Sequence, residues 1–149
     1  MATLSTEPTA ITGTVANPGG AFYPEMDLAA LGAARNLLQT DAAVITEKAT
    51  LALLDINDVL ATWRAEQELA GVTALTTDQQ TRYTAAAYDQ TMGRLVQTMP
   101  QVQGGGTARS AAKEENRDSA AWFASARYEL AHIMGQTGVG RAGSYVALI

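Results

Sequence analysis

Apolar residues recur at three- and four-residue steps over most of the chain, a pattern that favours helices. The predicted helices span about 28–38, 42–70, 78–99 and 108–134. Suitable N-caps precede three of them: Asp27, Asp41, and Thr76 or Thr77. Gly71 and Pro100 follow the second and third helices as stop signals. The pattern therefore predicts an all-α protein built as a four-helix bundle.

Both ends of the chain lack this periodicity. Residues 1–21 are rich in Thr, Ala, Pro and Gly and predict an extended arm with a turn, in which 10–15 is a candidate small strand. Residues 136–149 predict a glycine-rich linker and an extended, strand-like tail. We thus expect an arm (1–21), a helical bundle (22–135) and a linker with a tail (136–149).

Composition narrows the class of protein. The chain has 149 residues, 47% of them hydrophobic and 17% charged, which suits one folded domain. Its formal charge of −5 argues against a broad nucleic-acid clamp. There is no cysteine, and therefore no disulfide frame, thiolate metal site or cysteine nucleophile. We see neither a signal peptide nor an apolar run near the roughly 20 residues of a membrane span, so a soluble protein made in a cytoplasm is expected.

Two motifs could carry chemistry. Glu129 and His132 form a Glu-x-x-His pair, half of the ligand set of a di-iron bundle. His132 is the only histidine, so we favour a histidine at the core edge and a solvated glutamate, with a metal enzyme as the alternative. Gly138 to Gly143 spells G-x-G-x-x-G, but it follows a predicted helix rather than a strand, which indicates a hinge. No catalytic residue, metal or cofactor is expected, and the protein is not expected to be an enzyme.

The remaining charged and aromatic positions have ordinary interpretations. We expect surface charges at Asp55, Asp58, Glu66 and Glu68, and a solvated basic stripe at Arg109, Lys113 and Arg117. Trp63 and Trp122 are expected to pack in the core, because each has apolar neighbours at helical positions.

The tail is the most informative feature. Tyr145, Val146, Leu148 and Ile149 are apolar and follow a glycine-rich linker. Such a segment either folds back into a groove on its own bundle or reaches another protein. Its β-branched and aromatic residues suit a strand added to the edge of a partner's sheet.

Four segments together carry a resemblance to a known family. They are "FYPEMD" at 22–27, "LATWRAEQELAG" at 60–71, "WFASARYELAHI" at 122–133 and "YVALI" at 145–149. In order and spacing the chain resembles, from about Phe22 to Ile149, the head completion proteins of contractile-tailed phages. These proteins are head-to-tail connectors, also called adaptors, of the portal and neck.

This resemblance implies a structural virion protein of the head-to-tail neck, assembled in the host cytoplasm. It implies a homo-oligomeric ring, typically of twelve copies, that lies beneath the portal protein and receives a downstream neck or tail connector or a tail terminator. Genome DNA would pass through the channel without specific binding, and no membrane is involved. The implied portal-binding residues are Gly143, Ser144, Tyr145, Val146, Ala147, Leu148 and Ile149. Phe22, Tyr23 and Arg141 are further candidates for contacts with subunits or partners. The alternative is another phage neck or tail completion component.

Overall fold

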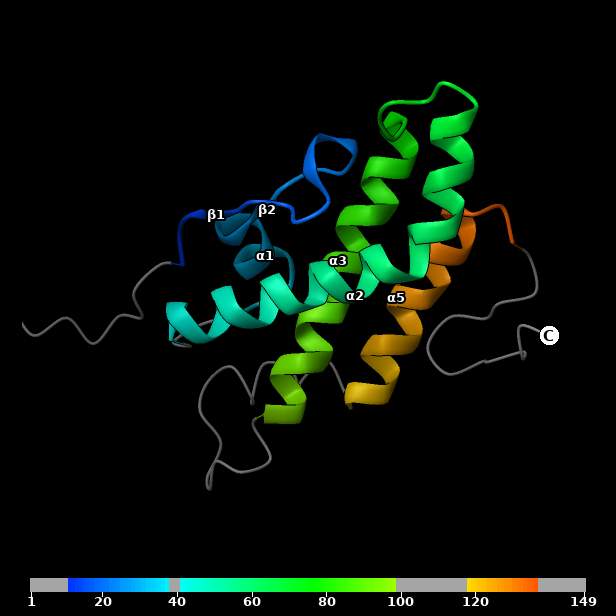
Figure 1. Cartoon of the computed structure of the whole chain (residues 1–149). Helices are drawn as coiled ribbons and strands as arrows, with labels where there is room; N and C mark the ends of the chain where they lie inside the picture. Colours follow the sequence, from blue (N-terminus) through cyan, green and yellow to red (C-terminus); the bar gives the residue numbers. More distant parts are fainter. Residues whose placement is uncertain (1–10, 38–40, 99–117, 137–149) are drawn as a thin grey trace, which may run out of the picture.

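The computed structural model describes residues 11–37, 41–98 and 118–136, which form packed helices and a small two-stranded sheet (Figure 1). In chain order the elements are β1 (Thr14–Val15), the 3-10 turn η1 (Gly20–Phe22), β2 (Met26–Asp27), α1 (Leu28–Ala34), α2 (Ala42–Leu69), α3 (Thr77–Thr98) and α5 (Ser119–Ile133). The predicted all-α class is confirmed. None of the helices in these three ranges is long and apolar enough to cross a membrane.

The helix ends follow the expected capping chemistry. The Asp27 carboxylate accepts hydrogen bonds from two backbone N–H groups at the start of α1, and the Asp41 carboxylate accepts one at the start of α2. Thr76 and Gln79 exchange side-chain-to-backbone hydrogen bonds of 3.2 and 2.9 Å before α3, which is a capping box. Gly71 follows α2 with a φ of +88°, a conformation that glycine adopts without strain.

Two predicted boundaries are wrong. α1 ends at Ala34 rather than near residue 38, because Asn36 adopts a left-handed φ of 55° that breaks the helix. α5 begins at Ser119 rather than near Ala108. Asp118 is extended and its side chain accepts a hydrogen bond from the N–H of Ala121, so a continuous helix over 108–134 is interrupted there. Residues 99–117 lie outside the described residues.

The core lies where α3 packs against α2 and α5. α3 and α5 run side by side in opposite directions, and α2 crosses them (Figure 1). The most completely buried large side chains of this core include Leu53, Ile56, Leu60, Tyr83, Met92, Leu95, Trp122 and Leu130. The expected core position of Trp122 is confirmed, and Trp63 is half-buried against the same core.

Ion pairs join α3 to each of the other three α-helices in the described ranges. Arg35, at the end of α1, contacts Asp89 of α3 at 3.0 Å. Arg94 of α3 contacts Asp55 of α2 at 2.6 Å. Arg82 of α3 contacts Glu129 of α5 at 2.8 Å. Helix α3 is therefore the element that fixes the arrangement of the described helices.

The N-terminal segment is packed on the helices and is not a free arm. β1 pairs antiparallel with β2, with Thr14 opposite Asp27, which confirms a small strand within 10–15. Ile11 and Val15 are buried in the same hydrophobic cluster as the helices. Residues 11–21 therefore form an extended segment with a turn, as predicted, and its apolar side chains pack on the bundle. Residues 1–10 lie outside the described residues.

A glycine sets the distance between α3 and α5. The ring of Phe123 lies over Gly93, and a Cβ atom added there would lie 2.6 Å from its Cδ1 atom. At Gly32 in α1 the nearest atom to such a Cβ is 3.5 Å away, an ordinary contact. Gly93 thus allows the two helices to approach closely.

We expect Gly93→Ala to lower the free energy of unfolding by about 1–3 kcal/mol, because the new methyl group overlaps the Phe123 ring. Gly32→Ala, the matched control, should raise it by about 0.5–1 kcal/mol through better helix propensity. Urea denaturation measures both. Equal stabilisation by the two substitutions would show that the Phe123 ring moves aside freely.

Candidate functional site

The sequence-predicted site residues fall into two groups. Gly143 to Ile149 and Arg141 lie outside the described residues. Phe22 and Tyr23 are described, and each is only 4% exposed. The Tyr23 ring stacks on Tyr83 with centroids 4.8 Å apart, and Phe22 meets Trp63 edge-on at 6.2 Å. The prediction that Phe22 and Tyr23 contact other subunits or partners is therefore wrong, because their rings are packed inside their own chain.

Arg64 of α2 holds this aromatic pair in place. Its guanidinium carbon lies 4.8 Å from the centre of the Phe22 ring and 5.2 Å from that of Tyr23, both in cation–π range. One of its terminal nitrogens donates a 2.7 Å hydrogen bond to the Gly19 carbonyl. The segments "FYPEMD" and "LATWRAEQELAG", some 40 positions apart in the sequence, therefore contact each other directly.

The side chains of Asn17, Asn57 and Tyr83, next to this aromatic pair, form a closed cycle of hydrogen bonds. The Asn17 amide donates to the Tyr83 hydroxyl at 2.7 Å, and that hydroxyl donates to the Asn57 carbonyl oxygen at 2.6 Å. The Asn57 amide donates back to the Asn17 oxygen at 2.9 Å. The cycle ties the N-terminal segment to both α2 and α3.

This cycle is suited to holding structure rather than to proton transfer. Burial raises the pKa of Tyr83 well above its ordinary value, an effect that the hydrogen bond from Asn17 only partly opposes. Burial likewise raises the pKa of Tyr23, against the opposing charge of Arg64. Both phenols therefore stay neutral over the physiological pH range and act as hydrogen-bonding groups and packing surfaces.

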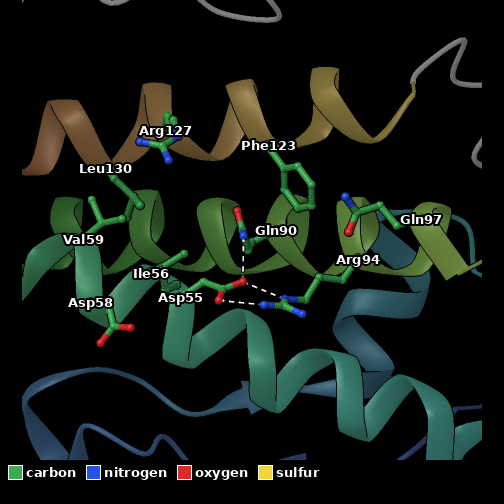
Figure 2. Close-up of a pocket in the computed structure, with 10 residues that line it drawn as sticks. All are labelled: Asp55, Ile56, Asp58, Val59, Gln90, Arg94, Gln97, Phe123, Arg127 and Leu130. Carbon is green, nitrogen blue, oxygen red and sulfur yellow. Dashed lines mark hydrogen bonds and ion pairs between the residues drawn. The ribbon is translucent and has the colours of Figure 1, made fainter.

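A groove of about 420 Å³ lies between α2, α3 and α5 (Figure 2). We call it the lateral groove. Its apolar lining comes from Ile56 and Val59 of α2 and from Phe123 and Leu130 of α5. Polar groups surround this lining, among them Arg127 of α5 at one edge (Figure 2). The groove thus has a mainly polar lining that carries charges of both signs, Asp55 and Asp58 as well as Arg94 and Arg127.

An ion pair closes one end of the lateral groove. Arg94 donates two hydrogen bonds to the Asp55 carboxylate, of 2.6 and 2.7 Å, and Gln90 donates a third of 2.8 Å (Figure 2). Burial alone would raise the pKa of Asp55, but the hydrogen bonds from Arg94 and Gln90 outweigh it and lower that pKa. The expectation that Asp55 is an ordinary surface charge is therefore wrong. The other three residues expected at the surface are exposed: Asp58, Glu66 and Glu68, the last of them beside Arg64.

The Glu-x-x-His motif is not arranged as a metal site in the described residues. Glu129 is 8% exposed and accepts a 2.8 Å hydrogen bond from Arg82, so the expected solvated glutamate is wrong. His132 is exposed, and its Nδ1 atom lies 3.0 Å from the Tyr128 carbonyl oxygen. Within the ranges that the structure describes, no three His, Asp or Glu side chains are grouped so that they could hold a metal ion.

Sequence analysis missed the hydrogen-bond cycle and the lateral groove. The sequence around Asn17, "ANPGG", signals a turn, but nothing in it indicates that its side chain meets residues 40 and 66 positions away. Comparison of the chain with protein-family models, curated proteins and solved structures found no match.

We expect Asn57→Ala to lower the free energy of unfolding by about 1–3 kcal/mol, since it removes the acceptor of the buried Tyr83 O–H and one of the two donors to the Asn17 oxygen. Asp58→Ala, at the next and exposed position of α2, should change it by no more than about 0.5 kcal/mol. A double-mutant cycle with Tyr83→Phe, followed by urea denaturation, tests the cycle itself. Additive losses would contradict a shared network.

The lowered pKa of Asp55 predicts acid-dependent stability. A carboxyl group whose pKa is lower in the folded state stabilises the fold above its unfolded pKa, near 3.8, and this contribution is lost as the pH falls through the folded value. We therefore expect Asp55→Asn to be destabilised at pH 7 and to approach the parent protein below pH 3.8. Thermal melts across this range measure the difference, with Asp58→Asn at pH 7 as the control for a surface carboxylate. A difference independent of pH would contradict the pairing with Arg94.

Proposed function

We propose that this protein is a structural connector of a phage particle, an adaptor that forms a ring beneath the portal and joins the head to the neck and tail. The observation that carries the proposal is the contact between segments on which the sequence resemblance rests. Arg64 and Trp63 of the second segment pack directly on Phe22 and Tyr23 of the first. Trp122 of the third segment is fully buried in the same core. The matching residues are thus those on which this fold depends.

The use of charged side chains also favours a structural role. The buried carboxylates Asp89 and Glu129 each pair with an arginine of another element. Asp55 does the same across the lateral groove. These pairs fix helices against each other, as a spacer that transmits load between head and tail requires, and they leave those carboxylates engaged rather than free for acid–base chemistry.

In this proposal the tail, residues 143–149, docks on the portal. Burying its four large apolar side chains and ordering its backbone are opposing free-energy terms of similar size, so one tail binds weakly. A ring presents many tails at once, and multivalent attachment is then firm. The net charge of −5 per copy is repeated around the ring and suits a channel through which DNA passes without binding.

We expect removal of residues 145–149 to leave the melting temperature and helical circular dichroism nearly unchanged and to abolish co-sedimentation with portal rings of the same phage. The physical reason is that the apolar side chains of the tail are sheltered by the portal and not by the bundle. A full-length variant with Leu148→Ser and Ile149→Ser controls for chain length and should bind as poorly as the truncated chain.

The truncated chain could also give a result that contradicts the proposal. A large fall in melting temperature together with retained portal binding would mean that the tail packs on its own bundle, and the connector proposal would lose its docking mechanism.

A further inference from the structure

We draw no further inference here: the strongest candidate, the lateral groove between α2, α3 and α5, is lined by charged side chains of both signs, and nothing in the structure shows what occupies it.

Discussion

The described fold depends on the closed cycle of hydrogen bonds among Asn17, Asn57 and Tyr83. Each of the three groups donates to the next, so no polar atom of the cycle is left to pay the desolvation penalty of an unmade bond. The cycle places the N-terminal segment over α2 and α3, and from this position Tyr23 stacks on Tyr83 and Arg64 covers the aromatic pair. Without it, the segment would keep its apolar contacts, the short sheet and the hydrogen bond from Arg64 to the Gly19 carbonyl, but it would lose the hydrogen bonds that join it to Asn57 and Tyr83.

Helix α3 connects the residues of this cycle to the other described helices. Its ion pairs reach α1, α2 and α5. Its Gly93 has no side chain, so the Phe123 ring of α5 packs directly against the backbone of α3. Partly buried ion pairs add little net stability, but they penalise alternative helix arrangements, in which a buried charge would be unpaired. The result is a body in which the described helices have a defined arrangement.

Local signals in the sequence predicted what is local in the fold. Asp27, Asp41 and Thr76 cap their helices as expected, because a cap depends on residues within one turn. The burial of Glu129 and the pairing of Asp55 were not predicted, because their partners Arg82 and Arg94 lie on other helices. Phe22 and Tyr23 looked like contact residues for the same reason: their neighbour Arg64 is distant in sequence. Helical periodicity says which face is apolar and not which helix covers it.

The long-range character of the cycle also fixes when it can form during synthesis. Asn17 is made before its partners, which lie 40 and 66 residues further along the chain. Chains grow from the N-terminus at about 5–20 residues per second, so the segment around Asn17 waits several seconds before α3 exists to receive it. The cycle therefore closes only after α3 has been made, and until then the Tyr23 ring lacks its stacking partner Tyr83.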